Sequence, residues 1–264
     1  MKSRLMLLIL FLIPFGLSAQ YPVIGKGKIP KGNITSFTER CYDTSQGISV
    51  LISKNTYNYS AEGIPIERKE YDTIDSLKVS QTISYIYEDG ELIEEVGAGY
   101  KISFAYDDLG NKLAEKYASA NTNDVKRFEY NSSGHLVKLV CYSAAGKLLY
   151  THLFKHDNQN VLLKFSYLVP DSISKNYYAV YEVDMKGKRV GERVYAENDF
   201  ILYNTKFDYD THGEMTREAR YNFNGSHSYT KKYEYIYDKY GNWTTLINKN
   251  KSSSYLITRQ IYYQ

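Results

Sequence analysis

The sequence predicts an all-β protein: an antiparallel array of β-hairpin repeats that forms one elongated or curled sheet. Three observations predict it. A motif ending in Gly or Asn recurs eight times, its copies are 20 to 28 residues apart, and tyrosine is unusually abundant, with 29 copies in 264 residues. Regular recurrence at this period is typical of repeat architectures. Tyrosine favours strands and combines an apolar ring with a polar tip, which suits a sheet whose faces are only partly covered.

Each copy of the motif reads as a strand, a turn and a return strand. An aromatic residue stands six positions before the final Gly or Asn in every full-length copy, and usually another stands four before it. Residues two apart share a face of a strand. Asp, Asn or Ser stands three before the final residue, where its oxygen accepts turn N–H groups, and Gly or Asn tolerates positive φ. We call this final residue the anchor. The eight anchors are Gly63, Gly90, Gly110, Gly134, Asn160, Gly187, Gly213 and Gly241.

A second, looser turn follows each return strand, so a repeat of ~25 residues holds two strands. With a leading pair at 33–42 and 48–59, the pattern predicts about eighteen strands and essentially no helix. No linker interrupts the series, and residues 33–264 are therefore predicted to form one repeat domain. Residues 20–32, which contain three Gly, three Lys and Pro30, are predicted to be an N-terminal leader.

Residues 1–19 have the three-part layout of a secretory signal peptide. Lys2 and Arg4 precede an apolar run of nine residues, 5–13, and Ala19 offers a small residue for cleavage. The run is shorter than the ~20 residues that span a bilayer. We therefore expect an exported protein, periplasmic or extracellular, with no membrane span after signal removal. Gln20 rather than Cys follows the expected cleavage site, so lipoprotein attachment is not expected.

The charge balance argues against nucleic acid as a partner. Without Lys2 and Arg4 the chain has 31 basic and 30 acidic residues, so the mature protein is nearly neutral. The two cysteines, Cys41 and Cys141, are about four repeats apart. At that separation along an extended array they are too far apart for a disulfide, and we expect free thiols.

The motif carries a family resemblance. Residues 106–111 (YDDLGN) and 237–242 (YDKYGN) resemble the core of the YD repeat of RHS and teneurin-type proteins. Degraded copies recur over about residues 56–264, so the chain resembles a short, secreted, bacterial member of that family. Long RHS proteins coil many more repeats into a shell around a toxin, whereas this sequence shows neither a toxin domain nor a processing core. The resemblance implies a curved or coiling antiparallel sheet outside the cytoplasm, and by analogy with recognition proteins of the family it implies partner binding.

No catalytic, metal or cofactor site is predicted, and the protein is predicted not to be an enzyme. The conspicuous aspartates recur at the turn position of most repeats, which indicates a structural role, because an active site needs such a residue once. His152 and His156 would lie ~13 Å apart along a strand, too far to share a metal ion. Nucleophile-elbow and phosphate-loop motifs are absent.

The tyrosine-rich face is the candidate binding surface, and its alternative interpretation is repeat packing. Cross-strand aromatic pairs stabilise sheets by ~0.2–1 kcal/mol each, so the rings have a structural use in any case. The predicted partner is a glycan or a cell-surface or periplasmic protein. An exported enzyme acting on polysaccharide through unidentified carboxylates, and a purely structural spacer, stay open as alternatives. The candidate binding residues are Tyr57, Tyr85, Tyr106, Tyr130, Tyr209, Tyr237 and Trp243.

Overall fold

The computed structural model describes residues 30–170, 172, 175–249 and 254–264. The predicted signal peptide and most of the predicted leader therefore lie outside the described residues. The described chain forms eighteen strands. They are β1 (Ile34–Asp43), β2 (Val50–Tyr59), β3 (Pro65–Tyr71), β4 (Val79–Glu88), β5 (Glu91–Gly97), β6 (Tyr100–Tyr106), β7 (Lys112–Ser119), β8 (Val125–Tyr130), β9 (Leu136–Tyr142), β10 (Leu148–His156), β11 (Leu162–Leu168), β12 (Tyr177–Val183), β13 (Arg189–Ala196), β14 (Ile201–Tyr209), β15 (Met215–Asn222), β16 (His227–Tyr237), β17 (Trp243–Lys249) and β18 (Tyr255–Tyr263).

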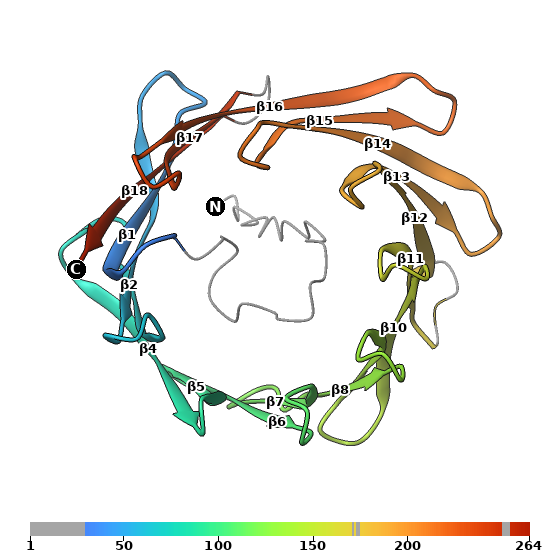
Figure 1. The fold of residues 1–264 in the computed structure, drawn as a ribbon, viewed down its shortest axis with the longest axis horizontal. Coiled ribbons are helices and arrows are strands. Elements are labelled where there is room, and N and C mark those ends of the chain that lie inside the picture. Colours follow the sequence, from blue (N-terminus) through green and yellow to red (C-terminus); the bar gives the residue numbers. More distant parts are fainter. Residues whose placement is uncertain (1–29, 171, 173–174, 250–253) are drawn as a thin grey trace, which may run out of the picture.

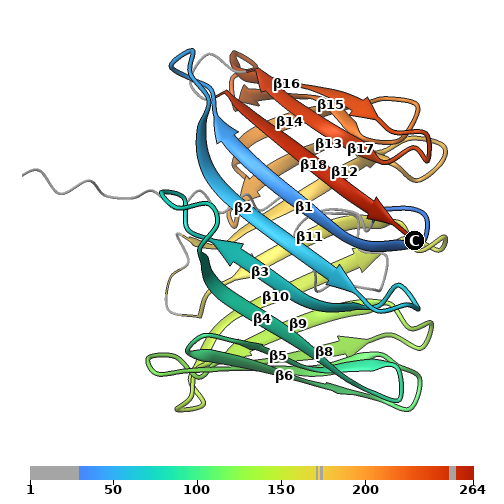
Figure 2. The same cartoon turned by 90° about the vertical axis from the view of Figure 1, so that its left-hand side faces the viewer.

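The strands form a closed barrel. Each pairs antiparallel with its neighbour in sequence, and β18 also pairs with β1 over nearly its whole length, from Ile34↔Tyr263 to Asp43↔Tyr255. Figure 1 shows the ring seen along its axis, and Figure 2 shows the strands crossing the wall obliquely. The prediction of about eighteen antiparallel strands is confirmed, whereas the prediction of an elongated or curled single sheet is wrong.

Closure also corrects the resemblance to YD-repeat proteins. That resemblance implied a sheet that coils onward from one repeat to the next, with free first and last strands. Here the first strand is hydrogen-bonded to the last, which removes both edges. The match at residues 106–111 and 237–242 is a match of local turn chemistry, and the identification of the chain as an RHS or YD-repeat protein is wrong.

The anchored turns form as their residue types predict. All eight anchors have positive φ, including Asn160 at 66°. In the Asp107 turn, Oδ1 accepts the backbone N–H groups of Leu109 and Asn111 at 2.9 and 2.8 Å. The same two hydrogen bonds, from backbone N–H groups two and four residues later, are accepted by Oδ1 of Asn131, Asp157, Asp184, Asp210 and Asp238. The recurrent aspartates are therefore turn residues.

A register shift accompanies every anchored turn. In the third repeat it falls between Ala105 and Tyr106, and the other seven repeats have one at the equivalent place. Such bulges bend a strand and increase its twist, which is how sheets acquire the curvature that closure needs.

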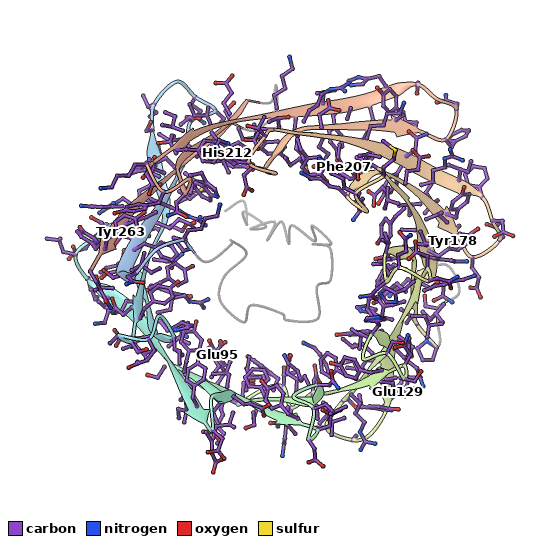
Figure 3. The ribbon with its side chains drawn as sticks, viewed as in Figure 1. Glu95, Glu129, Tyr178, Phe207, His212 and Tyr263 are labelled. Atoms are coloured by element: carbon purple, nitrogen blue, oxygen red, sulfur yellow. The ribbon has the colours of Figure 1, made fainter. Side chains whose placement is uncertain are left out.

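The two faces of the wall differ in composition. Figure 3 shows Phe207 and Glu95 on the inside of the ring and Glu129 and Tyr178 on the outside. Residues paired across neighbouring strands point to the same face of the wall. The strand register therefore assigns every remaining position to the inner or the outer face, and it places the aromatic columns of the motif on the inner face. Buried side chains gather in clusters along the inner wall; the one around Phe37, Tyr57 and Ile83 lies beside the β1–β18 seam.

Candidate functional site on the inner wall

The tyrosine-rich face predicted from the sequence is the inner wall of the barrel. Tyr57 and Tyr85 are almost fully buried there, at 5% and 6% exposure. Tyr57 stacks on Phe37 with ring centroids 4.5 Å apart. These two candidates lie within the packing of the wall and offer little ring surface to a ligand.

Three further candidates form inter-hairpin hydrogen bonds. The hydroxyls of Tyr106, Tyr130 and Tyr209 donate to backbone carbonyls in the preceding repeat, at 2.9, 3.0 and 2.7 Å. The acceptors are Leu92, Lys112 and Arg189, each two residues after an anchor. Each acceptor is a residue that resumes pairing beside a bulge, where the ladder is disrupted. These three tyrosines thus join their hairpins to the preceding ones.

Tyr237 and Trp243 have structural contacts of the same kind. Tyr237 donates to Asp210 of the preceding turn and stacks on His212 at 3.9 Å between ring centroids. Trp243 lies under the guanidinium of Arg259, 3.5 Å from its ring centroid, and packs edge-on against Tyr235. All seven candidates lie on the inner wall, each engaged with neighbours of its own or an adjacent repeat.

Over most of its circumference the inner wall carries paired charges. Glu115 accepts from Lys126 at 2.5 Å, and Glu39 accepts from Arg259 at 2.9 Å. Arginines also lie flat on tyrosines, as Arg220 does over Tyr203 at 3.8 Å.

Four consecutive strands depart from this pattern. The inward positions of β9 to β12, which the structure describes in full, carry no Lys, Arg, Asp or Glu. We call these four inner faces the aromatic sector. Its residues are Leu136, Leu139, Cys141, Tyr150, His152, Phe154, His156, Leu162, Phe165, Tyr167, Tyr177, Ala179, Tyr181 and Val183.

The rings of this sector form a continuous network. His152 lies at its centre, with centroids 4.9 Å from Tyr150, 5.0 Å from Phe165 and 5.4 Å from Tyr167. Tyr177 extends the network at 5.3 Å from Tyr167. All five rings are half-buried, so each keeps surface toward the lumen.

His152 stays uncharged at neutral pH. Burial, and to a lesser extent the positive charge of Lys126, lower the pKa of its imidazole to about 4. The aromatic sector is therefore an uncharged surface at physiological pH, bounded by Lys126 on β8 and by Arg189 and Glu192 on β13.

The motif does not predict this sector, because its columns contain the candidate tyrosines, whereas Tyr150, Phe165 and Tyr177 lie outside them. A signal was nonetheless present, because inward positions of other repeats hold Arg, Lys or Glu and those of 136–183 do not.

Three carboxylates on the inner wall form hydrogen bonds or ion pairs with other residues of the wall. Glu95 accepts from the Tyr100 hydroxyl at 2.8 Å, Glu218 accepts from Tyr229 at 2.6 Å, and Glu192 pairs with Arg189. A catalytic acid and base acting on a sugar would have to be carboxylates other than these three.

The two cysteines are thiols, Cys41 half-buried and Cys141 buried. They lie on β1 and β9, eight strands apart around the ring. Among the described residues no group of three or more His, Cys, Asp or Glu is arranged to hold a metal ion. No helix in the described part of the chain is long and apolar enough to cross a bilayer.

Comparison with known proteins gives structural likenesses alone. No family model matches the chain, and no curated protein matches it. A porin-like protein from Bacteroides uniformis is 12% identical, covers 86% of this chain and 96% of its own, and has a TM-score of 0.49. A porin-like protein from Bacteroides vulgatus is 10% identical, with 88% and 99% coverage and a TM-score of 0.31. The TcdB2-TccC3 protein without its hypervariable C-terminal region is 15% identical, covers 78% of this chain and 12% of its own, and has a TM-score of 0.33. At these identities and TM-scores they assign no function to this chain.

Proposed function

We propose that this protein is an exported, non-catalytic barrel that binds a neutral glycan on the aromatic sector of its inner wall. The observation that carries the proposal is the half-buried ring network around His152, set in a sector without charged side chains. Binding sites are concave, rich in aromatic and apolar groups, and contain few polar groups that fix orientation. The lumen of a closed barrel supplies the concavity.

The chemistry of the sector favours a sugar over a purely apolar ligand. Tyrosine offers a flat ring for the apolar face of a sugar and a hydroxyl for its polar rim. Tyr150, Tyr167 and Tyr177 combine both features side by side. An anionic glycan is disfavoured because the sector itself contains no cation.

The outer wall supports a location in water. Ion pairs cross between neighbouring strands on that face: Lys138–Glu129 at 2.8 Å, Arg193–Glu182 at 2.9 Å and Arg217–Asp208 at 3.1 Å. Lys and Arg on a lipid-facing strand cost about 2–4 kcal/mol each at mid-bilayer. With residues 1–19 as its export signal, the barrel is proposed to act in the periplasm or outside the cell without a membrane span.

The test is binding to a glycan array, followed by calorimetry with the best neutral oligosaccharide. In the double variant Tyr167→Leu/Tyr177→Leu, apolar volume is kept and the stacking surface is lost, so binding should weaken strongly. Tyr178 and Tyr195 provide the control, because they stack at 4.8 Å on the outer wall. Tyr178→Leu/Tyr195→Leu should bind as the wild type does.

Three outcomes would overturn the proposal. One is equal weakening in both double variants with the fold intact. Another is saturable binding of a protein but of no glycan. The third is turnover of a polysaccharide by the purified protein, which would favour the enzyme alternative.

A further inference from the structure

A hollow of about 500 Å³ opens at the rim of the barrel between the anchored turns of the fourth and fifth repeats. Asn131, His135, His156, Asp157 and Asn160 are among its lining residues. Its two histidines belong to different repeats and come together because β9 and β10 are neighbours in the sheet.

The hollow lies where an inter-hairpin hydrogen bond is missing. His156 occupies the column in which Tyr106, Tyr130 and Tyr209 reach the carbonyl two residues after the preceding anchor. The corresponding carbonyl is that of Leu136. An imidazole is shorter than a phenol, and among the described residues the Nδ1 atom of His156 is buried without a hydrogen-bond partner. The substitution in this column therefore leaves both a space and an unused nitrogen.

His135 supplies a second imidazole across that space. The ring centroids of His135 and His156 are 5.8 Å apart, and the planes are tilted by 44°. Zinc lies 2.0–2.1 Å from each coordinating imidazole nitrogen, which places the centroids of two rings on one ion about 5–6 Å apart. The observed separation matches that arrangement.

We propose that this hollow binds one divalent transition-metal ion that prefers imidazole ligands, such as Zn²⁺ or Ni²⁺, through His135 and His156. Asp157, whose Oδ1 accepts two turn N–H groups, also lines the hollow, and water completes the coordination sphere. A two-residue site is in keeping with the finding that no cluster of three or more ligating residues occurs in the described chain. Structurally, the ion joins the fourth turn to the fifth, as a tyrosine hydroxyl joins other neighbouring hairpins. The site shares His156 with the edge of the aromatic sector but does not include the ring network around His152, and it does not depend on the glycan proposal.

The experiment titrates the purified full chain with ZnCl₂ and separately with NiCl₂, by calorimetry and by thermal unfolding. The wild type should bind one ion per chain and show a higher Tm as metal is added, since a ligand of the folded state stabilises it. His135→Gln should abolish both effects. His227→Gln, which changes a histidine bonded to Thr230 near the opposite rim, should leave both unchanged.

A second variant keeps the proposal testable if His135→Gln unfolds. In His156→Tyr the phenol should donate to the Leu136 carbonyl, so the metal effect should disappear while Tm without metal rises. Wild-type protein that binds neither ion at millimolar metal would overturn the proposal. One-to-one binding that survives His156→Tyr would overturn it as well.

Discussion

Arg259 on the last strand donates from Nε to Oε2 of Glu39 on the first strand, at 2.9 Å. The two residues are 220 positions apart in sequence and lie directly opposite each other in the β1–β18 ladder. Arg259 is only 8% exposed, and its guanidinium also covers Trp243. This pair links the ends of the chain on the inner wall, at the seam that closes the barrel.

Arg259→Met should weaken that seam. It keeps much of the side-chain volume but leaves the Glu39 carboxylate half-buried without its cation, which we expect to cost about 2 kcal/mol of unfolding free energy. Urea denaturation measures the loss, and hydrogen exchange should localise it to β1 and β18. Arg193→Met, which breaks the exposed pair with Glu182, should cost less than about 1 kcal/mol. Equal losses in the two variants would contradict the role assigned to Arg259.

Tyr106→Phe should destabilise the barrel although the ring remains. The variant loses the hydroxyl that donates to the Leu92 carbonyl, and a hydrogen bond of this kind contributes about 1 kcal/mol. Tyr85→Phe is the matched control. Within the described residues the Tyr85 hydroxyl is buried without a hydrogen-bond partner, so its removal should be neutral or slightly stabilising. Chemical denaturation of the two variants side by side gives the comparison, and a larger loss for Tyr85→Phe would show the assignment to be wrong.

His152 should make stability depend on acid pH. Its pKa falls from 6.5 in the unfolded chain to about 4 in the barrel. Between those values the unfolded chain binds a proton that the folded barrel does not, so stability declines as pH falls from about 6.5 to 4, and this contribution levels off below 4. The groups facing His152 are aromatic rings together with Lys126. Urea midpoints at several pH values should fall less steeply for His152→Phe than for the wild type, and parallel curves would refute the prediction.

Gly63 should be sensitive to substitution for backbone reasons alone. It has φ of 78°, and a Cβ added there meets no atom within 4 Å. Gly63→Ala should therefore cost about 1 kcal/mol from the left-handed conformation, without any clash. Gly63→Asn should cost less, although Asn is larger, because Asn tolerates this conformation, as Asn160 does at the equivalent anchor. Thermal denaturation of the two variants distinguishes this account from a steric one, which reverses the order.

Cys41 should react slowly in the folded protein. Burial, together with the nearby negative charges of Glu39 and Asp43, raises the pKa of its thiol to about 11, so little thiolate is present at pH 8. Iodoacetamide should modify it much faster in urea than in buffer. Mass spectrometry of unreduced, unfolded protein should show both Cys41 and Cys141 alkylated. A mass two daltons below that of the dithiol form would instead indicate a disulfide.

The hairpins were predictable because their causes are local. The Asp107 turn depends on residues 107 to 111, and its carboxylate, the two N–H groups it accepts and the positive φ of Gly110 all lie within five positions. The same holds at the other full-length copies, so strand number, antiparallel order and turn roles followed from the pattern. The resemblance to the YD repeat misled for the same reason, because it too rested on residues within one turn.

The candidate sites were not predictable because their residues come from different repeats. His152 contacts Phe165 and Tyr167 across strands. Their surroundings are uncharged only because the inward positions of four neighbouring strands all lack charged side chains. In sequence, His156 is closest to His152 on its own strand, whereas the structure brings it to His135 of the preceding repeat. Such pairs depend on register, and register is set by the bulges between repeats.

By itself the sequence determined the repeating unit of this protein: two strands, an Asp- or Asn-capped turn and an anchor with positive φ. Only the tertiary structure decided that the sheet closes and that the tyrosine-rich face becomes an inner wall. The physical reason is that closure depends on twist and bulge curvature summed over eighteen strands, until β18 reaches β1. No single repeat contains that sum, and the contact that shows closure, between Glu39 and Arg259, joins the first strand of the chain to the last.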